Sequence, residues 1–142
     1  LNQALKVSGL GDQFLDNLQI WRGQMGLGLT TWAEMPEPSR SDCHAWGASP
    51  NIEFYRILLG IDSDAPGFRK IRIAPSLGKL KEVSGTIPHP LGSVTAAYKL
   101  DERGEGTARL VLPEGTTGIF IWDGKEIPLK PGEQVISLSL RH

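Results

Sequence analysis

A short, proline-interrupted stretch near residue 40 gathers most of the side chains that could do chemistry. Acidic, basic and aromatic residues crowd together there: Trp32, Glu34, Glu37, Arg40, Asp42, His44 and Trp46. Pro36, Pro38 and Pro50 interrupt the stretch, so most of it cannot be helix or strand. Carboxylates and a histidine can move protons or hold hydroxyl groups, and tryptophan rings offer flat apolar faces to a sugar. A rigid loop of this composition therefore favours a sugar-binding or sugar-cleaving site.

The residues before this loop have the spacing of an amphipathic helix. Four apolar side chains recur at steps of four, three and four: Phe14, Leu18, Trp21 and Met25. This spacing places them on one face of a helix over residues 12–25, and Asp12 is a residue type that caps helix starts. An earlier helix over residues 1–8 is expected to end at Gly9.

A further helix is predicted after the loop, over residues 50–59. Ser49 followed by Pro50 is a favoured helix start, and Gly60 ends the pattern. Its buried face is predicted to hold Ile52, Tyr55 and Leu59. The helices carry more apolar surface than they can bury among themselves, so residues 1–66 are expected to be one edge of a larger helical structure.

The apolar pattern changes from helical to alternating near Gly67. Seven candidate strands follow, separated by turn sequences rich in Gly, Pro and Asp: residues 69–74, 81–88, 92–100, 106–112, 117–122, 125–129 and 134–140. Asp123-Gly124 between two of these runs predicts a tight hairpin. About seven short strands at this spacing predict an antiparallel β-sandwich over residues 67–142, which makes the fold class α+β.

Composition excludes several classes of function. The chain has 142 residues and a net charge of −1 with acids and bases interspersed, which argues against binding to nucleic acid or to an anionic membrane. No apolar run approaches the length that spans a bilayer. The chain has one cysteine, Cys43, which excludes an internal disulfide, and no second His or Cys stands at metal-ligand spacing from His44. Neither a metal nor a cofactor is expected. Since the sequence starts at Leu1 without a Met or a signal peptide, we expect it to be part of a longer protein.

Several short motifs stand in a particular order along the chain. They are Thr30-Thr31-Trp32-Ala33-Glu34, His44, Gly47-Ala48, Leu59-Gly60-Ile61 and Gly67-Phe68-Arg69-Lys70-Ile71-Arg72-Ile73-Ala74-Pro75. In this order, and with the change from helix to strand, they resemble the bacterial α-L-rhamnosidases, a family of inverting glycoside hydrolases. The resemblance implies that residues 1–66 are the end of an (α/α)6 catalytic barrel and that residues 67–142 are the β-sandwich that follows it.

The resemblance also implies roles for four residues. Glu34 matches the general base, which deprotonates a water while a second carboxyl about 6.5–9.5 Å away protonates the glycosidic oxygen. His44 matches a sugar-binding histidine. Trp46 and Trp32 are expected to form apolar walls for the ring and methyl group of rhamnose, with Trp32 the weaker candidate. The general acid is expected upstream, in the rest of the barrel, so the chain alone is expected to be inactive on rhamnose-containing glycosides.

Two other classes of function stay open from the residues alone. One is a non-catalytic carbohydrate-binding or structural β-sandwich, which would need an exposed aromatic platform on its strands. The other is a different (α/α)6 sugar enzyme, such as a phosphorylase, although the sequence has no glycine-rich phosphate loop. Outside the loop, Trp21, Phe120 and Trp122 are interpreted as core residues and His89 as a turn residue. Glu37 and Asp42 are interpreted as surface charges or turn formers, and Cys43 as chemically inert. Arg40 is interpreted as a surface residue, with orientation of a carboxylate or binding of a hydroxyl group as the alternative.

Overall fold

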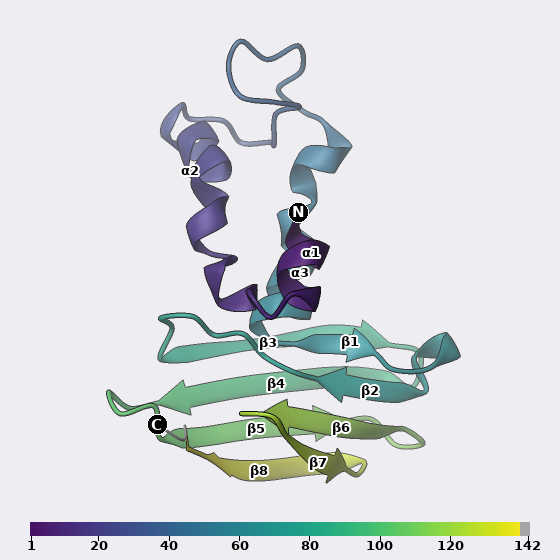
Figure 1. Cartoon of the computed structure of the whole chain (residues 1–142). Helices are drawn as coiled ribbons and strands as arrows, with labels where there is room; N and C mark the ends of the chain where they lie inside the picture. Colours follow the sequence, from purple (N-terminus) through teal and green to yellow (C-terminus); the bar gives the residue numbers. More distant parts are fainter. Residues whose placement is uncertain (140–142) are drawn as a thin grey trace.

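The computed structural model describes residues 1–139 and places a helical arm, residues 1–58, on top of a β-sandwich (Figure 1). The arm consists of short segments: α1 (Asn2–Val7), the 3-10 turns η1 (Gly11–Gln13) and η2 (Asp16–Leu18), α2 (Gln19–Gly26), the 3-10 turn η3 (Ala45–Ala48), α3 (Pro50–Glu53) and the π-turn η4 (Phe54–Leu58). The long loop between α2 and η3 forms the tip of the arm, farthest from the sheets.

The predicted helix over residues 12–25 forms only in its second half. The first half forms two 3-10 turns instead. Contacts with distant residues there override the preference for an α-helix that the apolar spacing indicates. Asp12 does not cap a helix; its carboxylate accepts a hydrogen bond of 2.9 Å from the backbone amide of Gly78. Phe14 is fully buried against Ile57, whereas Met25 at the far end of the predicted stripe is 64% exposed.

The predicted helix over residues 50–59 is an α-helical turn followed by a π-turn. Pro50 occupies the first turn as predicted, but the Ser49 side chain makes no capping hydrogen bond. Ile52 was predicted to be buried and is exposed, because no element of the described chain covers that face of α3. Leu59 is buried, and Gly60 ends the segment with a φ of 73°.

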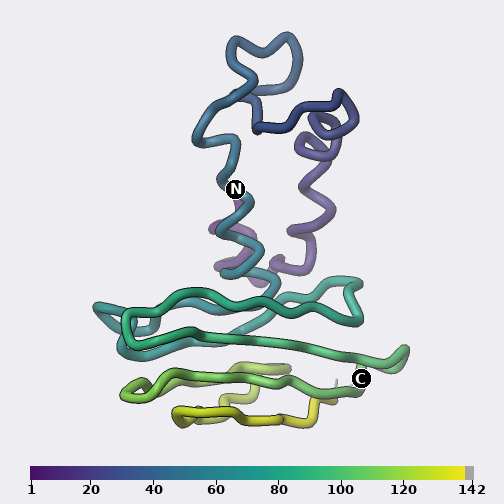
Figure 2. Tube along the Cα trace, turned by 180° about the vertical axis from the view of Figure 1, so that it is seen from behind, coloured from purple at the N-terminus to yellow at the C-terminus, as the bar shows by residue number. Residues whose placement is uncertain are grey.

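Within residues 1–139, eight strands form two four-stranded sheets that lie one behind the other in Figure 2. One sheet has the order β1-β2-β6-β7 and contains β1 (Ile61–Ser63), β2 (Lys70–Ile73), β6 (Thr117–Trp122) and β7 (Lys125–Leu129). The other has the order β3-β4-β5-β8 and contains β3 (Glu82–His89), β4 (Gly92–Leu100), β5 (Gly106–Leu112) and β8 (Gly132–Leu138). The predicted α+β fold with a β-sandwich is confirmed.

Two details of the sheets differ from the prediction: β1 was not predicted, and β2 pairs with β6 in parallel. The last predicted strand ends within the described residues at Leu138; residue 140 lies outside them.

The sandwich core follows from alternation along the strands. Ile71, Ile73 and Phe120 point inward from one sheet and meet Val94 and Leu110 of the other, all without exposed surface. Burial of each such side chain stabilises the fold by about 1.5–3 kcal/mol. Phe120 is thus a core residue as predicted, while Trp122 and Trp21 are half-buried at the edges of the two clusters of buried side chains.

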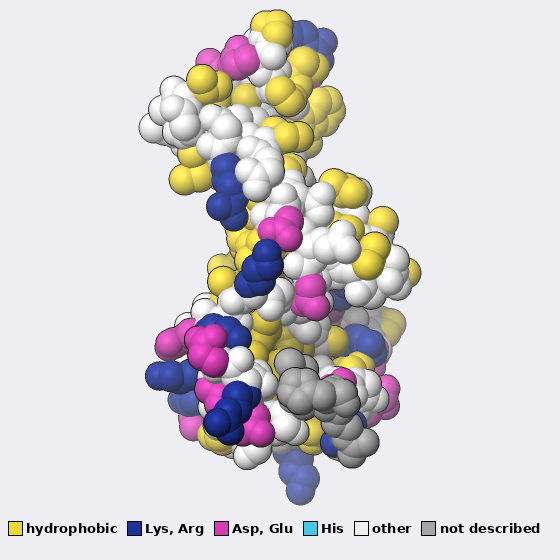
Figure 3. Space-filling view, turned by 60° about the vertical axis from the view of Figure 1, so that its left-hand side comes forward, with side chains coloured by type: hydrophobic (Ala, Val, Ile, Leu, Met, Phe, Trp, Pro, Cys, Tyr) yellow, Lys and Arg dark blue, Asp and Glu magenta, His cyan; other side chains and the backbone are white. Residues whose placement is uncertain are grey.

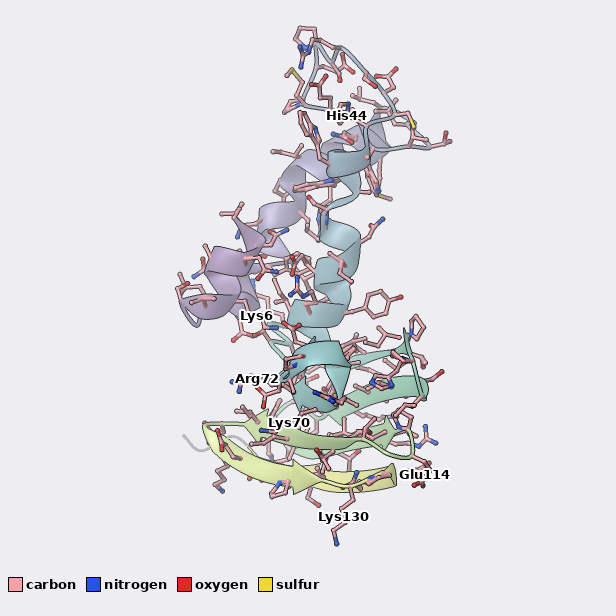
Figure 4. All side chains as sticks on the ribbon, turned by 90° about the vertical axis from the view of Figure 1, so that its right-hand side faces the viewer. Lys6, His44, Lys70, Arg72, Glu114 and Lys130 are labelled. Carbon is pink, nitrogen blue, oxygen red and sulfur yellow. The ribbon has the colours of Figure 1, made fainter. Side chains whose placement is uncertain are left out.

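Several polar contacts fasten the arm to the sandwich. The hydroxyl of Tyr98 on β4 donates a hydrogen bond of 2.7 Å to the carbonyl of Leu59, and burial raises the pKa of this hydroxyl. Asp62 on β1 accepts from the Lys6 ammonium at 2.7 Å and from Arg56 at 3.4 Å. Figure 4 shows Lys6 at this junction, above the labelled Lys70 and Arg72. The arm and the sandwich are therefore joined by buried and half-buried polar groups as well as by the chain itself.

The predicted hairpin at Asp123-Gly124 forms, whereas His89, predicted as a turn residue, is the last residue of β3. Asp123 and Gly124 have φ values of 49° and 69°, the left-handed pair that a two-residue hairpin requires, and they join β6 to β7. His89 is buried at the end of β3, where its Nδ1 accepts from the Leu91 amide at 3.1 Å. Its Nε2 therefore donates to the carbonyl of Phe68, 2.8 Å away, which links the β3–β4 turn to the segment before β2.

Candidate active site

The candidate site lies at the tip of the arm, where the loop folds back on itself. The amide of His44 donates to the carbonyl of Trp32 at 2.8 Å, and the amide of Glu34 donates to the carbonyl of Ser41 at 2.9 Å. The buried Gln24 of α2 accepts from the amide of Ala33 at 3.0 Å, which fixes the loop to the helix below it. These backbone contacts bring residues 32–34 alongside residues 41–44.

Glu34 has its carboxylate covered and bound to one partner. Its side chain is 5% exposed, although it belongs to a loop. Arg40 binds both oxygens: Nη2 donates to Oε1, and Nε donates to Oε2 at 3.2 Å. The Arg40 side chain is itself 74% exposed, so its guanidinium lies on the solvent side of the carboxylate. A buried charge needs such a partner, because desolvation without one is costly.

His44 and Trp46 form an aromatic pair beside Glu34. Their ring centroids are 4.2 Å apart with planes inclined by 39°. The Trp46 indole nitrogen donates to the Glu34 carbonyl at 3.1 Å, yet the residue is 59% exposed. Figure 4 shows His44 within the tip of the arm. The structure thus brings together three of the four residues that the sequence predicted: a carboxylate, an imidazole and an exposed indole.

Trp32 lies apart from these three side chains. It lines an apolar groove of about 360 Å³ on the arm, together with Trp21, Met25 and Phe54. The Trp21 indole nitrogen donates to the Gly47 carbonyl at 2.7 Å, and a Cβ on Gly47 would stand only 2.9 Å from the Trp32 Cβ. This close approach fixes Trp32 against η3, so its position is typical of a packing residue. Its predicted role in sugar binding stays a prediction.

The remaining polar residues of the loop lie in turns or at the surface. The Glu37 carboxylate accepts from the Ser39 amide at 3.2 Å, which shapes the turn, and Asp42 and Cys43 are exposed. The sequence predicted Arg40 as a surface residue, with orientation of a carboxylate as the alternative; Arg40 is exposed, and its guanidinium also binds Glu34. The sequence signal for this contact was the pair of prolines between Glu34 and Arg40, which favour a reversal of the chain.

Among residues 1–139, no group of three His, Cys, Asp or Glu side chains could hold a metal ion, and no helix is long and apolar enough to cross a membrane.

Comparison with known proteins identifies the family. The bacterial alpha-L-rhamnosidase C-terminal domain family matches residues 60–134, which is more than half of the chain. The chain belongs to this family. The resemblance found in the sequence motifs is therefore confirmed, and the match covers the sandwich from just before β1 into β8. A comparison with curated protein sequences gives no match.

Solved structures extend the similarity to the arm. The native α-L-rhamnosidase from Aspergillus terreus superposes with a TM-score of 0.87 and 21% identity over 97% of this chain. The α-L-rhamnosidase from Dictyoglumus thermophilum gives a TM-score of 0.68 at 18% identity over 82% of the chain. The Streptomyces avermitilis enzyme, solved in complex with L-rhamnose, gives 0.63 at 18% identity over 84%. The chain spans 18%, 17% and 14% of these three structures, so it shares its fold with a small part of each.

Proposed function

We propose that this chain forms one wall of the active site of an α-L-rhamnosidase, a glycoside hydrolase that removes terminal α-L-rhamnose with inversion. The observation that carries the proposal is the covered Glu34 carboxylate, on a residue whose backbone carbonyl binds the exposed indole of Trp46, which in turn pairs with the half-buried His44 ring. Membership of the rhamnosidase C-terminal domain family supports the reaction class. In this assignment residues 1–66 complete the catalytic barrel and residues 67–142 form the sandwich that follows it.

Glu34 is assigned the role of general base. A carboxylate in this role takes a proton from the water that attacks the anomeric carbon, on the face opposite the leaving group. Inversion also requires a carboxylic acid that protonates the glycosidic oxygen from the other side, about 6.5–9.5 Å from the base. We assign that acid to the part of the barrel upstream of this chain. The isolated chain is then inactive, because one carboxylate cannot carry out both proton transfers.

His44 and Trp46 are assigned to the sugar. Rhamnose is a 6-deoxy sugar, so one part of its surface is a methyl group and the rest carries hydroxyl groups. The exposed face of Trp46 suits the apolar part, and the His44 imidazole suits a hydroxyl. The rhamnose bound in the Streptomyces avermitilis structure supports this choice of ligand. Trp32 is assigned a secondary contact through the apolar groove.

The test uses an α-L-rhamnosidase that contains this chain as its C-terminal region. Glu34→Gln keeps the shape and removes the base, so kcat on an aryl α-L-rhamnoside should fall by at least about 100-fold. His44→Ala should mainly raise KM, because a hydroxyl contact is largely made in the ground state. Glu114→Gln is the matched control: Glu114 is exposed on the sandwich, at the opposite end of the molecule from His44 (Figure 4). Near-normal kcat in Glu34→Gln would make Glu34 a structural residue. Turnover by the isolated chain at an ordinary enzymatic rate would contradict the assignment of the acid.

A further inference from the structure

Arg40 is the one side chain in the described residues with a hydrogen bond to the Glu34 carboxylate. Its Nε and Nη2 donate to Oε2 and Oε1, so the guanidinium meets the carboxylate edge to edge. This fork arrangement fixes the plane of the carboxylate as well as its position, which a single hydrogen bond cannot do. The orientation of Glu34 is therefore set by Arg40.

The turn that carries Arg40 is itself braced. The Ser39 hydroxyl donates to the Ser41 carbonyl at 2.9 Å, and the Ser39 amide donates to the Glu37 carboxylate at 3.2 Å. The Ser41 carbonyl also accepts from the amide of Glu34 at 2.9 Å. The turn and the residue that it faces are thus held to each other by the backbone, independently of the guanidinium. The backbone of Arg40 therefore has a fixed position relative to Glu34.

The contact leaves some lone pairs of the carboxylate unused. A carboxylate offers about four lone-pair positions, and the guanidinium uses one on each oxygen. One position on each oxygen remains for a water molecule. A base held in this way can bind the attacking water in a defined direction while the carboxylate cannot rotate away from it.

We propose that Arg40 is a positioning residue for the base: it holds the Glu34 carboxylate in the orientation that directs the attacking water. The inference rests on the proposed function, since it assigns Arg40 a role through Glu34. It differs from a role in sugar binding, because it requires the effect of Arg40 to disappear when Glu34 can no longer act as a base.

The test compares five variants of the rhamnosidase that contains this chain: Arg40→Met, Arg40→Lys, Glu34→Gln, the double variant Glu34→Gln/Arg40→Met, and Arg103→Met. Arg103 is the matched control, an exposed arginine in the β4–β5 turn of the sandwich. Arg40→Met should lower kcat at least about tenfold with KM changed less than about threefold, since the lost interaction acts on the transition state. Arg40→Lys should recover only part of kcat, because an ammonium cannot donate two parallel hydrogen bonds. In the Glu34→Gln background, Arg40→Met should change the residual rate by less than about twofold.

The outcomes separate the two proposals. If Glu34→Gln loses activity and Arg40→Met keeps it, Arg40 has no positioning role and the proposed base stands. If Arg40→Met lowers kcat by the same factor with and without Glu34, Arg40 acts on the substrate directly and the inference is wrong. If Glu34→Gln is nearly as active as the unmodified enzyme, the proposed function itself fails. Should Arg40→Met fold poorly by thermal melting, Arg40→Lys with and without Glu34→Gln gives the same comparison.

Discussion

Glutamate side chains are usually exposed and tryptophan side chains usually buried, but Glu34 and Trp46 show the opposite. The carboxylate of Glu34 is nearly covered, while the large aromatic ring of Trp46 faces solvent at the tip of the arm. Neither arrangement stabilises an isolated loop, since burial of a charge costs free energy and exposure of an indole gains none. A loop that keeps both is better explained by binding than by folding.

At the junction, Asp62 allows an electrostatic prediction. Burial by itself raises the pKa of Asp62, but the hydrogen bond and charge of Lys6, the Ser63 amide and the charge of Arg56 together hold the pKa below its usual value of 3.8. A carboxyl whose pKa is lower in the folded state stabilises the fold above its unfolded pKa, and this stabilisation disappears as the pH falls through the folded pKa. Asp62→Asn should therefore lower the free energy of unfolding by about 1 kcal/mol at neutral pH. The difference from the unmodified chain should shrink below pH 3.8.

Asp64 provides the control for this measurement. Its carboxylate binds Lys70 at the same distance, 2.7 Å, but the Lys70 side chain is much more exposed than that of Lys6. Asp64→Asn should have a smaller effect at every pH, because solvent screens the exposed pair. Urea unfolding at several pH values measures both. An equal effect of the two substitutions, or a pH-independent effect of Asp62→Asn, would contradict the argument.

What the sequence predicted at the residue scale depended on local motifs. Glu34, His44 and Trp46 stand within one stretch, so their types and order were sufficient to predict them as a group, and their chemical roles stay predictions. Asp12 was predicted wrongly because its partner, the Gly78 amide, is distant in sequence. A helix cap depends on adjacent residues, whereas this hydrogen bond depends on how the arm meets the sandwich.

The elements of the sandwich were predicted more accurately than those of the arm. Alternation and turn residues are local signals, and they located β3 to β8 closely. Strand β1 is only three residues long, which is too short to show the alternation of apolar and polar residues that marks a strand. In the arm, Phe14 and Ile57 are fully buried in the same cluster. The segments that carry them are 3-10 turns and a π-turn, where the sequence pattern predicted regular α-helix. Such a contact has no local signature in the sequence.

Gly60 is the element-scale position where substitution is expected to cost most. It has a φ of 73°, and a Cβ there would collide with the backbone of Ala74 and Pro75. Its carbonyl also accepts from the Ala74 amide at 3.0 Å, so the backbones cannot separate without loss of that bond. Gly60→Ala should therefore lower the free energy of unfolding by about 3 kcal/mol or more, which combines left-handed strain with a backbone clash.

Gly67 is the matched control for this prediction. Its φ of 70° is nearly the same, but a Cβ there would meet no atom within 4 Å. Gly67→Ala should cost only the left-handed strain, about 1 kcal/mol. Chemical denaturation of the two variants separates strain from collision. Equal losses would show that the close approach of Gly60 to Ala74 is relaxed at little cost.

For the whole molecule, the arm and the sandwich differ in surface character. Of the twelve large hydrophobic side chains that are exposed within residues 1–139, ten lie in residues 1–54 and two, Leu91 and Val135, lie in the sandwich. Figure 3 shows hydrophobic side chains over much of the arm, while Lys, Arg, Asp and Glu side chains gather over the sandwich on the face drawn. We therefore expect the sandwich to behave as an independent domain and the arm to pack against other protein.

This difference predicts how the chain behaves on its own. Met25 on the arm and Val135 on the sandwich are 64% and 65% exposed, so they offer equal apolar surface in different settings. Met25 adjoins the apolar groove that Trp21, Trp32 and Phe54 line, whereas Val135 stands beside the Arg109–Glu133 ion pair. A contiguous apolar patch drives association and dye binding, and a single apolar side chain among charges does not.

Met25→Gln should therefore reduce the binding of a hydrophobic dye and shift the chain toward monomer in light scattering. Val135→Thr, which keeps the β-branched shape, should leave both measurements unchanged. A chain that is monomeric at all concentrations and binds no dye before substitution would mean that the arm needs no further protein to cover it.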